Sequence, residues 1–394
     1  MNFRFTPEQE AFRREIREFL RKELPAEWYA GEFELGSDEE WELSRQFQKK
    51  LAERGWLVPH WPKQYGGSDM GLWEQMVLRE ELGYHRAPLG NAVFGINMLG
   101  PILMLYGTEE QKREHLPRIA RAEVTWCQGW SEPGSGSDLA SLQTRAVRDG
   151  DEYVINGQKI WTTGAHRADW IFFLARTDPN APKHKGISFF LAPMNAPGIR
   201  VQPIINMAGI HSFNQVFFED VRIPAKNLVG EENRGWYLGA ALLDFERSGI
   251  GAVASLKRDL DDLVEYCRET KVGSRPLMAQ GWVRYALADR AVEVEVGRYL
   301  SYRVTSMQAR GQIPNAEASM TKLFSSELAQ RLANTGVKVM GLYGQVRLES
   351  GRWARLHGRF AMAYMMTVAS TIAGGTSEIQ RNIIATRGLG LPRG

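Results

Sequence analysis

The chain has 394 residues, of which 43% are hydrophobic and 24% charged, as is ordinary for a soluble globular protein of two or three domains. Its net charge of +3 comes without a block of lysine or arginine, which argues against nucleic-acid binding. Two cysteines are too few for a disulfide framework, and we find neither a signal peptide nor an apolar run of about 18 residues. We therefore expect a cytoplasmic protein with no membrane insertion.

Residues 1–122 are expected to form a helical N-terminal domain. Apolar residues recur at helical spacing from Phe12 to Leu20, and Thr6 supplies an N-cap just before Pro7. Further helical patterns lie near residues 39–55, 70–85, 90–106 and 108–120.

Residues 123–232 change to the pattern of β-strands. Alternation or short apolar runs bounded by turn residues occur at 142–147, 153–156, 170–175 and 187–191. Turn signals follow at Asp149-Gly150 and at Asn156-Gly157. We expect a middle β-barrel domain.

Residues 233–394 return to long helical segments, near 236–268, 276–310, 315–341, 350–373 and 376–388. Their number and length favour a four-helix bundle packed against a β domain. The sequence thus predicts an α+β multi-domain chain with an N-terminal helical domain, a middle β-barrel and a C-terminal four-helix bundle.

Two stretches in the middle domain carry the strongest chemical signal. Residues 126–138 are W-C-Q-G-W-S-E-P-G-S-G-S-D, and about 25 residues later residues 157–164 are G-Q-K-I-W-T-T-G. Glycine and serine give tight turns with free amides, which suit a pyrophosphate, and tryptophan offers a flat apolar face. Neither stretch is a P-loop or a dinucleotide fingerprint. Together they could bind one large planar heterocycle carrying a pyrophosphate, although glycine and serine in plain loops and tryptophan in the core would give a similar pattern.

With F-F-E-D-V-R-I-P at 217–224 and G-G-T-S-E-I-Q-R at 374–381, these stretches resemble the acyl-CoA dehydrogenase family of flavoproteins. The motifs occur in the family's order, and the resemblance covers essentially residues 1–392. It implies FAD as cofactor, an acyl-CoA substrate, and an electron-transfer flavoprotein as electron acceptor. The implied reaction is α,β-dehydrogenation to the trans-2-enoyl-CoA, as in β-oxidation of fatty acids or other lipids.

The resemblance also assigns cofactor contacts residue by residue. Gly136 and Ser137 fall where the pyrophosphate is held, Thr163 near flavin N5 and O4, and Thr376 and Glu378 at the adenosine half. Hydrogen bonds at N5 and O4 tune hydride acceptance. The full set of implied cofactor contacts is Gln128, Trp130, Ser131, Gly136, Ser137, Trp161, Thr163, Gln280, Thr376 and Glu378.

The adenosine end departs from the pattern of the homotetrameric members. There a neighbouring subunit supplies Arg-x-x-Phe-Gly and Gln-x-x-Gly-Gly-x-Gly, whereas this chain begins the first motif with Glu269 and the second with Lys338. An acidic residue in the arginine position would repel a pyrophosphate. Either a different subunit completes the site in a hetero-oligomer, or the loop is shifted, Lys271 or Lys338 substitutes, and the chain forms a homo-oligomer.

The catalytic base is also displaced. Many members carry it in Tyr-Glu-Gly-Thr near the C-terminus, but here Gly374 occupies the glutamate position. A minority place it on the long helix that opens the C-terminal domain, where this chain has Glu246. The resemblance therefore implies that Glu246 removes the α-proton while the β-hydride moves to flavin N5; a helix carboxylate paired with Arg247 is the alternative. It also implies substrate contacts at Ser137, Asp244, Arg247 and Gly374. We expect no metal.

Two other functions stay open. The chain could be a non-catalytic or half-site subunit of a hetero-oligomeric acyl-CoA dehydrogenase, which the altered adenosine contacts favour. It could also be a flavin oxidase or monooxygenase of the same fold. The small side chain at Gly374 would widen the pocket and admit branched, long or polycyclic acyl groups.

Overall fold

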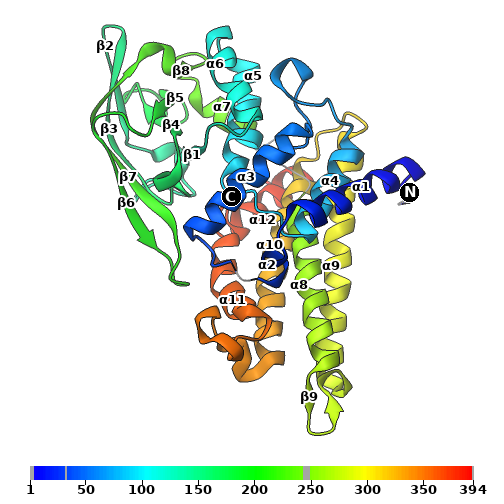
Figure 1. Cartoon of the computed structure of the whole chain (residues 1–394). Coiled ribbons are helices and arrows are strands. Elements are labelled where there is room, and N and C mark those ends of the chain that lie inside the picture. The colour runs from blue at the N-terminus through cyan, green and yellow to red at the C-terminus, as the bar shows by residue number, and fades with distance from the viewer. Residues whose placement is uncertain (1–3, 32, 243–248, 393–394) are drawn as a thin grey trace. The chain divides into compact units, whose positions relative to one another are not determined.

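The computed structural model describes residues 4–31, 33–242 and 249–392, and the chain divides into two compact units (Figure 1). The first unit comprises Met1–Glu34, Gly71–Ala87 and Arg247–Gly394, and the second comprises Leu35–Met70 and Pro88–Glu246. None of the helices in the described ranges combines the length and apolar character that crossing a membrane demands.

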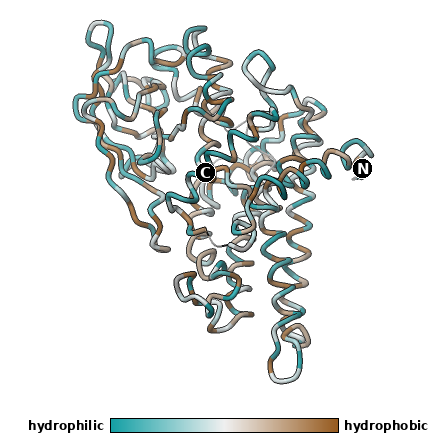
Figure 2. Tube along the Cα trace, viewed as in Figure 1, coloured by the Kyte–Doolittle hydropathy of each residue, from teal (hydrophilic) through white to brown (hydrophobic). Residues whose placement is uncertain are grey.

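The first unit is helical. Its elements are α1 (Pro7–Glu23), α2 (Ala26–Ala30), α4 (Leu72–Tyr84), α8 (Ile250–Glu269), the hairpin β9 (Lys271–Val272) and β10 (Arg275–Pro276), α9 (Gly281–Gln308), α10 (Asn315–Met340), α11 (Arg359–Ser370) and α12 (Ser377–Ile383). Helices α8 and α9 are long neighbours joined through the β9–β10 hairpin (Figure 1). In Figure 2 hydrophobic and hydrophilic positions alternate along both, as expected for helices with one face in a core.

Two local features of the sequence shape this unit. Helix α1 begins as predicted with Thr6 as N-cap and Pro7 at the first helical position, and Thr6 and Gln9 bind each other's backbone amides in a capping box. Helices α10 and α11 approach closely at Gly336, where an added Cβ would lie 2.0 Å from Phe360 Cδ1. The core shared by α8, α9, α10 and α11 therefore depends on glycine at that crossing.

The second unit contains helices and the sheet. Its elements are α3 (Asp38–Glu53), α5 (Gly100–Tyr106), α6 (Glu109–Ala120), β1 (Trp126–Gly129), β2 (Arg145–Asp149), β3 (Glu152–Lys159), β4 (Trp170–Arg176), β5 (Ile187–Pro193), β6 (Ile199–Ile205), β7 (His211–Pro224), β8 (Leu228–Val229) and α7 (Gly235–Leu242). The strands form one eight-stranded sheet in the order β6-β7-β3-β2-β4-β5-β8, with β1 pairing in parallel with β4. Buried aromatic and aliphatic side chains from β3, β4, β5 and β7 fill its core.

The predicted order of a helical, a sheet and a second helical region is confirmed, whereas one helix prediction is wrong in part. Leu348–Trp353 and Arg355–Gly358 form two short 3-10 segments, and α11 begins only at Arg359. Gly351, Leu356 and His357 all have positive φ, which a continuous right-handed helix cannot accommodate. The predicted domain boundaries at 122/123 and 232/233 stay predictions.

Candidate cofactor site

The first predicted cofactor stretch leaves the sheet at the end of β1. Trp126 pairs with Trp170 of β4, and a tight turn follows in which Glu132 and Ser135 exchange backbone hydrogen bonds of 2.9 and 3.0 Å. Gln128, Trp130 and Ser131 are half-buried before this turn, and Gly136 and Ser137 are exposed after it. The turn thus separates a sheltered segment with an indole from an open segment rich in glycine and serine.

The second stretch begins in the last three residues of β3 and continues beyond its end. Trp161 has φ of +60°, an uncommon conformation for a bulky residue, and its side chain is 56% exposed. Thr162 is fully buried and Thr163 half-buried. Phe213 of β7 meets the Trp161 ring edge-on, with centroids 5.9 Å apart. The indole is therefore held outward by its backbone and is accessible to a ligand.

A buried ion pair joins the two stretches. Lys159 Nζ, on a side chain with no exposed surface, lies 2.7 Å from Glu132 Oε1 and also donates to the Trp130 carbonyl at 3.3 Å. The Ile160 amide donates to the Ser131 carbonyl at 2.8 Å. Residues far apart in the chain are thereby fixed side by side within the second unit.

The Glu132 carboxylate has a full set of donors. Besides Lys159, it accepts the amides of Gln143 at 2.6 Å and Thr144 at 2.9 Å. Burial favours the neutral acid, but Lys159 and these donors hold the Glu132 pKa below its usual value. Burial lowers the pKa of Lys159 to about 8, with the attraction of Glu132 opposing it, so both groups are charged at pH 7.

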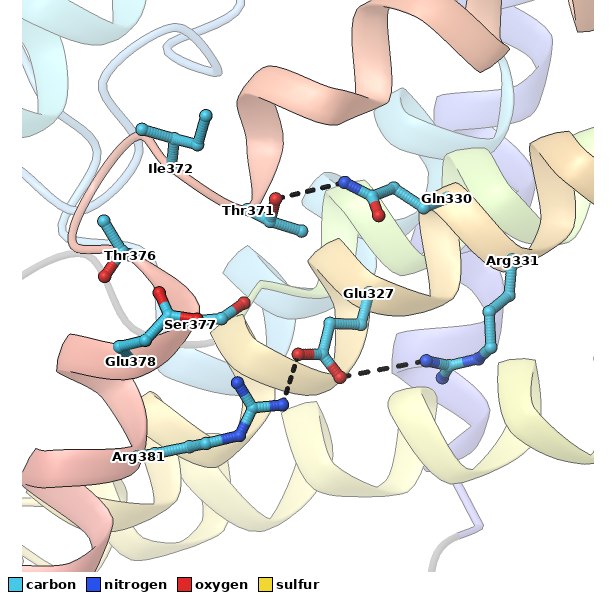
Figure 3. Close-up of a pocket in the computed structure, with 9 residues that line it drawn as sticks. All are labelled: Glu327, Gln330, Arg331, Thr371, Ile372, Thr376, Ser377, Glu378 and Arg381. Carbon is cyan, nitrogen blue, oxygen red and sulfur yellow. Dashed lines mark hydrogen bonds and ion pairs between the residues drawn. The ribbon is translucent and has the colours of Figure 1, made fainter.

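The C-terminal motif lies in the first unit, beside a cavity of about 460 Å³ (Figure 3). Thr376 caps α12 by accepting the Ile379 amide, and Glu378 is exposed on the first turn. Ser377 Oγ is buried with no hydrogen-bond partner among the described residues. The cavity is lined by Glu327, Gln330, Arg331, Thr371, Ile372, Thr376, Ser377, Glu378 and Arg381.

Three of the four charged side chains that line this cavity form ion pairs with one another. Glu327 lies between Arg381, at 2.6 Å, and Arg331, at 3.9 Å, as the dashed lines in Figure 3 mark. Gln330 donates to the Thr371 hydroxyl at 3.0 Å. The structure therefore places Thr376 and Glu378 beside a polar, charge-balanced hollow of the size that part of a cofactor could fill.

Two further predicted residues also lie in the first unit. Gln280 occupies the N-cap position of α9 without a side-chain capping bond, and its Oε1 accepts a hydrogen bond from Trp282 Nε1 at 2.7 Å. Gly374 has φ of +64°, and an added Cβ would meet nothing within 4 Å. Its carbonyl accepts from Gln380 at 2.9 Å, which fixes the loop before α12.

The predicted base Glu246 and the predicted substrate contacts Asp244 and Arg247 lie outside the described residues. Their roles, and the cofactor roles of the residues above, stay predictions. Sequence reasoning missed Glu132, Lys159 and the buried Asn214 beside Thr162. The signal available for the first two was a glutamate and a lysine, residues of opposite charge, one inside each of the two short motifs.

Comparison with known proteins identifies the family. Models of the acyl-CoA dehydrogenase N-terminal, middle and C-terminal domains match residues 6–123, 127–221 and 233–389. The acyl-CoA dehydrogenase IpdE1 of Mycobacterium tuberculosis is 38% identical over 391 residues, covering 98% of each chain. This chain belongs to the acyl-CoA dehydrogenase family. It is an acyl-CoA dehydrogenase oxidoreductase, and its cofactor is FAD.

Solved structures agree with the fold. A chain of the Tcur3481–Tcur3483 steroid ACAD matches with a TM-score of 0.90 and 37% identity, covering 100% of both chains. A chain of the ChsE4–ChsE5 complex from Mycobacterium tuberculosis gives the same score, identity and coverage. Both relatives carry two chain names, and the second is described as a complex.

The described residues of the second unit fit FAD. Trp130 Nε1 is a buried donor with no partner among them, as expected of a group that awaits an acceptor on a ligand. Gly136 would have open space around an added Cβ, so a bulky anion could approach its backbone. The exposed indole of Trp161 offers an apolar face for a planar ring.

Proposed function

We propose that this dehydrogenase catalyses α,β-dehydrogenation of an acyl-CoA thioester to the trans-2-enoyl-CoA, with Glu246 as the base. The observation that carries the proposal is the exchange of residues at two positions. Gly374 stands where many family members have their glutamate, and Glu246 stands where the remaining members have it. The two substitutions compensate each other, which a chance helix carboxylate would not explain.

Each group has a definite task. The carboxylate of Glu246 takes the α-proton, and the Gly374 backbone N–H donates to the thioester oxygen as negative charge develops there. When bound, FAD supplies the acceptor for the hydride that leaves the β-carbon. Trp130 and Trp161 would hold the ring and keep water from it, and Thr163 would donate to its polar edge.

The pyrophosphate would bind near Gly136 and Ser137. Thr376 and Glu378 beside the cavity of Figure 3 would contact the adenosine half, with Gln280 as a further contact. Both arginines of the cavity are already paired with carboxylates and Glu378 adds a negative charge, which suits a neutral nucleoside better than a bare anion.

We infer that the substrate has a bulky acyl group of the polycyclic, steroid type and that the enzyme acts in lipid catabolism. Other members place a carboxylate side chain at the position of Gly374, where this chain has open space, so the acyl end of the pocket would be wider. One relative of 37% identity is named a steroid ACAD, which supports the same substrate class.

Anaerobic bleaching of the bound flavin tests both the reaction and the base. Wild type should bleach with acyl-CoAs, and most rapidly with sterol-type thioesters in a panel that also contains straight and branched chains. Glu246→Gln should stay oxidised, whereas Glu265→Gln, a matched change at an exposed carboxylate of α8, should bleach like wild type. Bleaching of Glu246→Gln at the wild-type rate would refute the assigned base, and a preference for straight chains would refute the substrate class.

We further infer that a related but different chain completes the adenosine end of the site. Glu269 at the end of α8 is exposed where other members have arginine, and Leu342, 82% exposed, replaces a glycine. Next to it, Tyr343 stacks on Trp353 with ring centroids 6.3 Å apart. The two solved relatives, each with two named chains, support this arrangement.

Flavin content decides this point. The chain expressed alone should retain substoichiometric FAD, and coexpression with a related dehydrogenase subunit should restore it. Full FAD occupancy in a homo-oligomer of this chain alone would refute the hetero-oligomer. In the catalytic cycle, the reduced flavin would pass its electrons to an electron-transfer flavoprotein. Reoxidation of the bleached enzyme by that protein would show this transfer.

A further inference from the structure

We propose that Asn214 of β7 is the positioning residue that holds Trp161 and Thr163 in their cofactor-binding conformation. This inference rests on the proposed function, because it takes those two residues to contact the flavin. Asn214 and Thr162 have no exposed surface, and Thr162 stands between the two predicted contacts. Asn214 therefore acts from behind the segment and would not touch the cofactor itself.

One residue satisfies both backbone polar groups of Thr162. The Thr162 amide donates to the Asn214 carbonyl at 2.9 Å, and Asn214 Nδ2 donates back to the Thr162 carbonyl at 3.0 Å. The next bond along this register runs from the Gly164 amide to the Ser212 carbonyl at 2.9 Å. The second cofactor stretch thus pairs with β7 through backbone hydrogen bonds like those between strands, and the Asn214 side chain adds one more bond to this pairing.

The orientation of the Asn214 amide follows from its partners. The Thr162 carbonyl only accepts, so Nδ2 must face it and Oδ1 must face His211 Nε2, which lies 2.8 Å away. The second Nδ2 hydrogen points to His166 Nδ1 at 3.1 Å. The two imidazoles stack with centroids 3.8 Å apart, and together they leave the amide one orientation.

This network has a use because the segment is strained. Trp161 has φ of +60°, a conformation that a free tryptophan-containing loop would leave. Ile160 is tied to Ser131 on one side and Thr162 to Asn214 on the other, so the residue between them cannot relax. Without the Asn214 side chain, the Thr162 amide keeps its bond to the Asn214 carbonyl, but the Thr162 carbonyl keeps only a longer bond from the Ala165 amide, at 3.4 Å. The indole would then be held less firmly in its direction.

Asn214→Asp tests the proposal, since aspartate is nearly isosteric but cannot donate to the Thr162 carbonyl. The rate at which the holoprotein releases FAD is measured after dilution, from the fluorescence of the freed flavin. We expect this rate to rise about tenfold, the usual scale for losing one buried hydrogen bond. The visible flavin spectrum should shift as well. Asn227→Asp is the matched control, because Asn227 Nδ2 also binds a backbone carbonyl, that of Leu191 at 3.0 Å, outside both cofactor stretches.

A second variant covers the case in which Asn214→Asp does not fold. His211→Phe keeps a stacked ring but removes the donor to Asn214 Oδ1, and we expect FAD release about threefold faster with an altered flavin spectrum. Release rates and spectra that match wild type in His211→Phe, and in Asn214→Asp where it folds, would overturn the proposal. The measurement needs no acyl-CoA, so its failure is distinct from a failure of substrate to bleach the flavin.

Discussion

Replacing Lys159 by methionine should destabilise the second unit strongly. The change leaves the Glu132 carboxylate, 7% exposed, with its two backbone amide donors but without its countercharge. Removing one partner of a buried ion pair costs about 3–5 kcal/mol, because the remaining charge stays out of water. For an unfolding unit of about 200 residues this corresponds to a fall in midpoint temperature of roughly 6–20 °C.

The midpoint temperature is measured by following thermal unfolding with circular dichroism. The flavin content of each preparation is determined alongside. Lys226→Met is the control, since Lys226 forms an ion pair of 2.8 Å with Glu110 in which both side chains are 59% exposed, and we expect no measurable change there. The double variant Lys159→Met with Glu132→Gln should recover part of the loss, because the unpaired charge is gone. A midpoint for Lys159→Met equal to that of Lys226→Met would refute the account of the buried pair.

Three further outcomes follow from the described contacts. The Glu132 pKa is lower in the folded than in the unfolded protein, so the ionised carboxylate stabilises the fold at pH values above its unfolded pKa of about 4.5. This contribution is lost as the pH falls through the folded pKa, so the free energy of unfolding of Glu132→Gln should depend less on pH in the acid range. Gly336→Ala should cost about 1–3 kcal/mol in urea unfolding, since the new methyl group would overlap Phe360. Thr6→Ala should cost about 1 kcal/mol and speed amide exchange in the first turn of α1.

Local signals predicted much of the fold. Apolar spacing placed α9 and α10 to within a few residues of Gly281–Gln308 and Asn315–Met340, and the N-cap at Thr6 was found where the residue types indicated. The 3-10 segments before α11 could not be predicted in this way. Leu356 and His357 take left-handed conformations that neither side chain prefers, so tertiary contacts decide their backbone.

The sequence allowed the motifs of the site to be predicted, but not the residues Glu132, Lys159 and Asn214 that hold them in place. Trp130, Trp161 and Gly136 stand out because each lies in a short stretch that combines tryptophan, glycine and hydroxyl residues. Asn214 carries no such mark, since a single asparagine in a strand is an unremarkable residue. Its importance depends on which backbone it faces, and that is set by how β7 and the segment after β3 come together.

The buried pair of Glu132 and Lys159 shows why the residues that hold the two cofactor stretches in place are polar. A leucine–methionine pair of similar volume would be easier to bury, but it could not bind the Gln143 and Thr144 amides or the Trp130 carbonyl. Those backbone groups belong to irregular segments that the sheet does not satisfy, so each needs a side-chain partner. A glutamate and a lysine meet these needs and fix the register of the two cofactor stretches at once. Apolar packing could have supplied stability here, but not that register.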